Sequence, residues 1–170
     1  MSTEQDLRQE SLAYYESDLE AIEKILDGLR EGALAGGCLL VDRNGHLVAC
    51  NGLWKEGHDP DHLSALVAGT ANAMLALGRS LGATTPQLHL RCEDGRGIHL
   101  VWVEGQAVLA TAFDGATTES LVRIYSQEAR SSLATLFVQI AARGAPSEKL
   151  DEAYIQSAKE ALNYMLGAME

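Results

Sequence analysis

The chain has 170 residues, of which 46% are hydrophobic and 22% are charged, a balance typical of a folded domain rather than a disordered one. Its formal net charge of -11 argues against nucleic acid or an anionic membrane as a partner, because both require clustered Lys and Arg. No run approaches the roughly 18 apolar residues of a membrane span, and the polar N-terminus does not resemble a signal peptide, so we expect a cytoplasmic protein.

The N-terminal part of the chain predicts a tail followed by a helix. Residues 1–13 carry no periodic apolar pattern and are expected to be a mobile tail. An apolar stripe at helical spacing follows, and Ser17 with Glu20 fits a capping box, so the helix is expected to begin near Ser11 or Ser17. Gly32 marks its end.

Two strands and a second helix are predicted next. Residues 38–41 and 46–50 read as strands joined by a tight turn at Asn44-Gly45, which requires a positive φ. The first strand is apolar on both faces, which indicates helices on both sides of the sheet. Asp59 and Pro60 are typical of the N-cap and first residue of a helix, which is expected to end at Gly82.

The second half of the chain predicts three strands followed by two helices. Residues 88–92 alternate between apolar and polar, which suits an edge strand, and turns then lead into strands at 98–103 and 107–113. A long helix is expected from about Thr117 to Arg143, and a last helix is expected to begin at Ser147.

The second helix is expected to have two different faces. One stripe is large and is predicted to cover the sheet: Leu63, Leu66, Val67, Met74, Leu77 and Leu81. The other side is small where Lys or Glu would be typical of a solvated helix: Ala65, Ala68, Gly69, Asn72, Ala73 and Ala76. Small residues let a second backbone approach closely, so this side is interpreted as a docking face, with cover by another part of the chain as the alternative.

The sequence lacks the motifs of common enzyme classes. It has no Gly-Lys pair for a phosphate-binding loop, no nucleophile elbow and no Cys-x-x-Cys or His-Glu-x-x-His metal motif. His58 and His62 flank a helix start, where capping and solvation explain them better than a metal ion. The three cysteines are expected to be reduced and mostly buried (Cys38, Cys50 and Cys92). We therefore predict a protein with no catalytic residues of its own, no metal and no cofactor.

Two segments carry a resemblance to a known family. Residues 63–82 resemble the second helix of the Roadblock/dynein-light-chain family, and residues 39–48 resemble its first hairpin. The resemblance covers about residues 14–143, which are expected to be one Roadblock-type domain, with residues 144–170 as a linker and C-terminal helix. Within the family, Leu53-Trp54 and residues 150–154 are most similar to the MglB type, bacterial regulators of polarity and gliding motility.

The resemblance implies an α+β fold in which a five-stranded antiparallel sheet lies between helices, in the order α-β-β-α-β-β-β-α, plus an extra C-terminal helix. It also implies a homodimer whose third strands pair edge to edge, through Leu88, His89, Leu90, Arg91 and Cys92. MglB-type dimers bind an MglA-like Ras-family GTPase across paired second helices and stimulate GTP hydrolysis by holding the GTPase's own switch residues in place. The matching positions here are Ala65, Ala68, Gly69, Asn72 and Ala76.

Several details of that resemblance remain open at this point. Asn72 replaces an alanine common in the family, so affinity or partner choice is expected to differ. Arg79 is better explained as a solvated residue at a helix end than as an arginine finger. Trp54 is either an interface anchor or a lid folded under the helix. The resemblance implies that the C-terminal helix reaches the GTPase through Leu150, Tyr154, Leu162 and Met165, with docking on its own dimer as the alternative.

Two other functional classes remain as alternatives. Roadblock domains also serve as scaffolds or adaptors without any effect on hydrolysis. A small-molecule sensor is the third hypothesis, because profilin-like and PAS-like domains share a similar arrangement, although the apolar strands do not predict a polar-lined cavity.

Overall fold

The computed structural model describes residues 14–55, 59–83 and 87–143, and the structural statements below concern these residues. They form three α-helices, five strands and one short 3-10 helix, in the order α1 (Glu16–Gly32), β1 (Gly37–Asp42), β2 (Leu47–Cys50), η1 (Gly52–Lys55), α2 (Pro60–Ser80), β3 (Gln87–Arg91), β4 (Gly97–Val103), β5 (Ala107–Phe113) and α3 (Glu119–Arg143). The predicted tail at 1–13 and the predicted linker and helix at 144–170 lie outside the described residues.

The strands form one antiparallel sheet in the order β2-β1-β5-β4-β3, with β5 at the centre. The strand β5 is buried along its whole length, whereas β3 at one edge is mostly exposed or half-buried. The α+β fold class predicted from the sequence is confirmed, and so is the position of the third strand at an edge.

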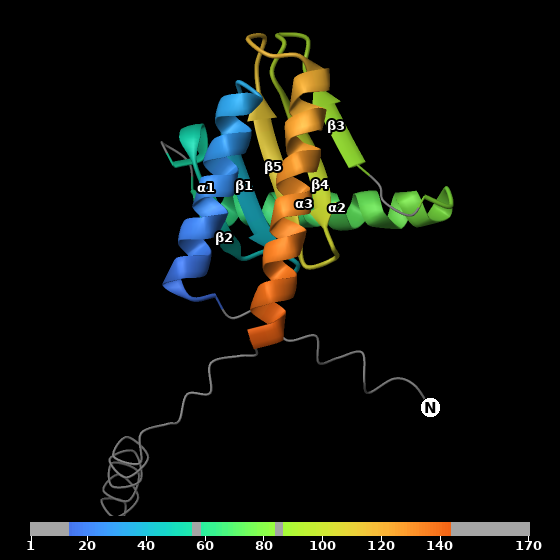
Figure 1. Ribbon diagram of the computed structural model, residues 1–170. Helices are drawn as coiled ribbons and strands as arrows, with labels where there is room; N and C mark the ends of the chain where they lie inside the picture. Colours follow the sequence, from blue (N-terminus) through green and yellow to red (C-terminus); the bar gives the residue numbers. More distant parts are fainter. Residues whose placement is uncertain (1–13, 56–58, 84–86, 144–170) are drawn as a thin grey trace, which may run out of the picture.

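Helices cover both faces of the sheet (Figure 1). The helices α1 and α3 pack together on one face, where Leu26, Leu40 and Leu133 belong to one buried cluster. The helix α2 crosses the other face and contributes Val67 and Met74 to a second cluster. The interior strands are apolar on both faces because each face is covered, which explains why residues 38–41 show no alternation.

The helix α1 begins one residue before the predicted capping box. Its N-cap is Tyr15, whose backbone N–H donates to the Asp18 carboxylate at 2.9 Å. Asp18 also pairs with Arg143 at the end of α3, and this contact holds the pKa of the Asp18 carboxyl below its usual value. The prediction that Ser17 and Glu20 cap the helix is wrong, because Asp18 is the residue held by both the helix start and a distant arginine.

The tight turn between β1 and β2 is confirmed. Gly45 has a φ of 93°, and the Asp42 carboxylate accepts hydrogen bonds from the backbone N–H groups of Asn44 and His46, both at 2.8 Å. Beyond β2, the buried Asn51 returns to β1: its side-chain oxygen accepts from the N–H of Cys38 at 2.7 Å.

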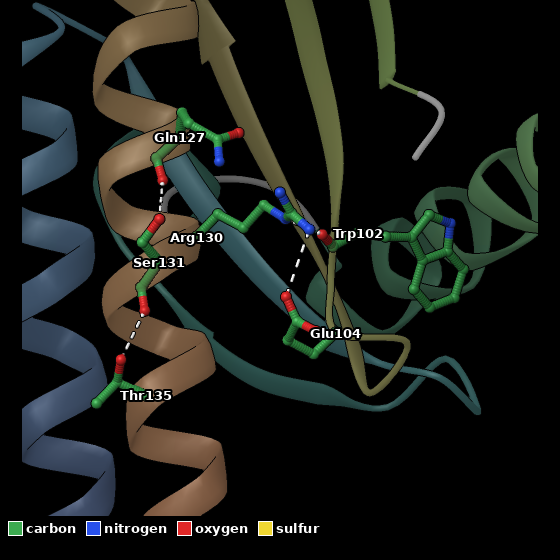
Figure 2. Close-up of polar contacts among 6 residues, drawn as sticks. All are labelled: Trp102, Glu104, Gln127, Arg130, Ser131 and Thr135. Carbon is green, nitrogen blue, oxygen red and sulfur yellow. Dashed lines mark hydrogen bonds and ion pairs between the residues drawn. The ribbon is translucent and has the colours of Figure 1, made fainter. Parts of the chain in front are cut away.

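Trp102 of β4 is hydrogen-bonded to the helices on both faces of the sheet. Figure 2 shows the contacts on the α3 side. On the α3 side, Arg130 Nε donates to the backbone carbonyl of Trp102 at 2.8 Å, and its Nη2 lies 3.4 Å from Glu104 Oε1. On the α2 side, the Trp102 indole Nε1 donates to the carbonyl of Ala71 at 3.3 Å. One residue of β4 therefore contacts both helical layers.

None of the helices among the described residues is long and apolar enough to cross a bilayer.

Candidate functional site: a helix face and a sheet edge

The helix α2 begins as its sequence predicts. Asp59 accepts hydrogen bonds from the backbone N–H groups of Asp61 at 3.1 Å and His62 at 3.4 Å, and Pro60 is the first helical residue. His58 lies outside the described residues, and the described part of the chain holds no cluster of three His, Cys, Asp or Glu side chains suited to a metal ion.

The faces of α2 differ from the prediction. The side that covers the sheet carries mostly small or medium residues: Ser64, Val67, Ala68, Ala71, Met74 and Gly78. Three of the leucines assigned to the sheet instead point outward, with Leu66 54%, Leu77 64% and Leu81 77% exposed. The indole of Trp102 fills the space beneath Ala71, so the helix packs there through small residues.

The predicted partner-binding residues therefore separate into two groups. Ala65, Gly69, Asn72 and Ala76 are exposed, together with Ala73, whereas Ala68 is buried against the sheet. We call the exposed set, with Leu66 and Leu77, the outer face of α2. Apart from Asn72 it offers no side chain able to hydrogen-bond.

Gly69 lies at the middle of this outer face. A Cβ placed there would meet nothing within 4 Å, so no contact inside the described part of the chain requires a glycine. Because glycine inside a helix costs about 1 kcal/mol relative to alanine, its presence needs another reason. The sequence prediction assigns Gly69 to a docking face, and its exposed position is compatible with that prediction.

The second feature is the edge formed by β3, where the predicted residues lie as expected from Leu88 to Arg91, with Cys92 just beyond the strand. Leu88 packs into the cluster on the α2 side, and Leu90, two residues along on the same face, is 53% exposed. Figure 1 shows the C-terminal part of α2 extending beyond this edge. The C-terminal part of α2 and the exposed Leu90 therefore lie at the same edge of the sheet.

The opposite side of β3 is closed by aromatic contacts. The His89 ring stacks on Phe113 with centroids 4.9 Å apart, and its Nδ1 lies 3.4 Å from Nδ1 of His99. Burial and the neighbouring His89 lower the pKa of His99 to about 4, so His99 is neutral at pH 7. His89 Nε2 lies 3.8 Å from Glu119 Oε2 on α3. These contacts position the strand.

The structure also places two residues left open by the sequence. Trp54 is buried in the cluster beneath α2, which favours the lid over the interface anchor. Arg79 is exposed near the end of α2, as expected for a solvated residue. Leu150, Tyr154, Leu162 and Met165 lie outside the described residues.

With this geometry established, comparison with known proteins gives the family. A model of the Roadblock/LC7 domain matches residues 21–112, more than half of the chain. The chain belongs to the Roadblock/LC7 domain family. No match is found among curated protein sequences.

Solved structures of this family resemble the chain closely. Myxococcus xanthus MglB is 28% identical with a TM-score of 0.68, over 76% of this chain and 96% of that one. The gliding protein MglB from Thermus thermophilus is 28% identical with a TM-score of 0.67, over 76% and 97%. An MglB in a tetrameric arrangement is 27% identical with a TM-score of 0.68, over 76% and 97%. The chain therefore has an MglB-like Roadblock fold.

Sequence reasoning missed the contacts that join the two helical layers to β4. The link from Trp102 to Ala71 joins residues 31 positions apart, and Arg130 reaches Trp102 from 28 positions away. A signal for the first was present: a tryptophan inside an apolar strand requires small residues on the helix above it, and α2 has them.

Proposed function

We propose that this protein is a homodimeric, MglB-like regulator of an MglA-type Ras-like small GTPase. The observation that carries the proposal is the outer face of α2, an apolar surface of small and large residues next to an open sheet edge, in a chain similar to MglB proteins.

The dimer is built from the edge and the end of the helix. Pairing of β3 with β3 of a second copy would satisfy the open side of the strand, and Leu90 would lose its exposure. The part of α2 that extends past β3 would then lie over the second copy, where Leu77 and Leu81 have apolar surface to bury. Two second helices would form one composite surface.

That composite surface takes the GTPase. Small residues such as Ala65, Gly69 and Ala76 allow the partner's backbone to approach. Because the outer face of α2 carries no charge, burying it against a partner costs little desolvation energy. The regulator acts by binding one switch conformation of the GTPase more tightly than the other, which holds the partner's own residues ready for hydrolysis. The chemistry then stays in the partner, and the protein works in the cytoplasm.

The test is GTP turnover by an MglA-like GTPase, titrated with this protein beyond two chains per GTPase. Acceleration that saturates near two to one is expected. Asn72→Arg with Ala76→Arg should abolish it, because both positions are exposed on the outer face. The matched control is Glu20→Arg with Glu23→Arg, two exposed positions on α1 across the sheet, which should leave acceleration unchanged.

Other outcomes point to the alternatives. Binding without acceleration would replace GTPase activation with a scaffold role. Absence of binding, or equal loss with the α1 variant, would overturn the outer face of α2 as the GTPase site and leave the sensor hypothesis.

A further inference from the structure

The helix α3 has an exposed outward side that carries Ile124, Ser131, Thr135 and Val138, and we call this side the lane. From Ser131 to Ala142 it contains no charged residue, although seven of these twelve positions are exposed. Two large apolar side chains mark the lane: Ile124 is 61% exposed and Val138 is 68% exposed. Their spacing of 14 residues places them on the same side of the helix.

Two polar side chains of the lane, Ser131 and Thr135, donate hydrogen bonds to their own helix. Ser131 Oγ donates to the carbonyl of Gln127 at 3.0 Å, and Thr135 Oγ1 donates to that of Ser131 at 3.1 Å (Figure 2). Because these hydroxyls bond back to their own helix, covering them costs little desolvation. At its Ile124 end the lane opens into a groove of about 530 Å³ beside β3, which Gln87, Arg123 and Gln127 also line.

We propose that residues 147–166 of the same chain fold back as a helix onto this lane, with Leu150 and Tyr154 beside Val138 and Leu162 and Met165 at the groove. The proposal concerns the face opposite α2 and does not depend on the GTPase role.

Length and position favour this segment as the occupant. The segment follows α3 directly after Gly144, Ala145 and Pro146, a connection of the length that joins antiparallel helices. Both the lane from Arg143 back to Ile124 and residues 147–166 number 20 residues, about 30 Å each at 1.5 Å per residue.

Large and small residues follow one another along the segment in the order that an antiparallel contact with the lane requires. Its apolar residues recur at helical spacing: Leu150, Tyr154, Ala158, Leu162 and Met165. In an antiparallel run the large residues fall within about one turn of Val138 and Ile124, and the small Ala158 falls beside Ser131. An amphipathic helix must bury its apolar stripe, and this lane begins where the segment does.

Charge agrees with the assignment. Residues 147–170 hold five acidic residues and two lysines, and Arg123 is the one charged residue among the described residues lining the groove. The acidic residues at the start of the segment therefore run beside the uncharged stretch Ser131–Ala142, whereas the exposed Glu128 adds one acidic group between this stretch and the groove.

Hydrogen–deuterium exchange on the full chain tests the proposal. Backbone amides of residues 150–165 should exchange at least tenfold more slowly than in an unstructured peptide. Ile124→Glu with Val138→Glu should remove this protection while amides of β1 and β5 keep theirs, because both side chains are exposed. The matched control is Leu66→Glu with Leu77→Glu, of similar exposure on the opposite face of the sheet, which should leave residues 150–165 protected.

Unprotected amides in the native chain, protection that survives the α3 variant, or protection lost in the α2 control would each overturn the proposal. Crosslinking decides whether the segment belongs to the same chain. With Ser131→Cys and Ala158→Cys in a Cys92→Ser background, a short bis-maleimide should give an internally linked monomer. A covalent dimer would instead show that a second copy supplies the segment.

Discussion

Replacing Arg130 with methionine removes two interactions that one side chain makes, and a second variant, Glu104→Gln, separates them. Its Nε donates to the Trp102 carbonyl at 2.8 Å, and its Nη2 lies 3.4 Å from the Glu104 carboxylate. The Arg130 side chain is 20% exposed and that of Glu104 is 58% exposed, so the first contact is the better protected from water. Methionine keeps the apolar stem and removes both donors.

The expected magnitudes differ. A hydrogen bond from a charged donor contributes about 1.5–3 kcal/mol, whereas an exposed ion pair contributes about 0–1 kcal/mol. Arg130→Met is therefore expected to lower the free energy of unfolding by about 2 kcal/mol. The control Glu104→Gln, which keeps the shape of the side chain and removes the ion pair, should lower it by at most about 0.5 kcal/mol.

Urea unfolding at two protein concentrations measures both effects and separates monomer stability from dimerisation. A cost of Glu104→Gln equal to that of Arg130→Met would refute the reasoning, because Arg130 would then act mainly through its ion pair. In that case the stability difference would also shrink at high salt, whereas the hydrogen bond to Trp102 should be nearly insensitive to it.

Single contacts elsewhere in the domain give three further predictions. Arg143→Gln should lower the melting temperature at pH 7, because the ion pair with Asp18 is lost. Arg143 lowers the folded-state pKa of Asp18, so the difference in melting temperature between the variant and the native protein should shrink as the pH falls below about 4. The difference that remains at low pH is assigned to the contact of Arg143 with the Tyr15 ring. Asn51→Ala should cost about 1–3 kcal/mol in urea unfolding because the buried N–H of Cys38 loses its acceptor, whereas Asp27→Asn, at the exposed partner of Asn51, should cost less than about 1 kcal/mol. Burial raises the pKa of the Cys38 thiol to about 12, so a thiol reagent at pH 8 should label the exposed Cys92 readily and Cys38 only after denaturant is added.

The sequence predicted most of the fold because local signals and the fold agree. The positive φ of Gly45 and the N-cap at Asp59 are local features that the residue types at a turn and at a helix start predict. The edge position of β3 was predictable from the alternation of Leu88 and Leu90 with polar residues.

What failed depended on residues distant in sequence. The outward position of Leu66 and Leu77 contradicts the rule that large residues cover the sheet: α2 faces the sheet through Val67, Ala71 and Met74, and the Trp102 indole bonds to the helix at Ala71. The helix begins at Glu16, next to the predicted Ser17, but its N-cap Tyr15 and the pairing of Asp18 with Arg143, 125 residues away, were missed. Neither partner can be read from a local pattern.

Substitutions on the outer face of α2 and on the outward face of α3 can be tested without disturbing the core. The buried clusters on both sides of the sheet are complete without either of these two faces. Charged substitutions at Ala76 or Val138 remove no buried contact, so they should change binding without unfolding the domain. Packing among the described residues accounts neither for the exposed leucines of α2 nor for Gly69, and this is the observation from which the proposed docking of another protein surface on α2 is argued.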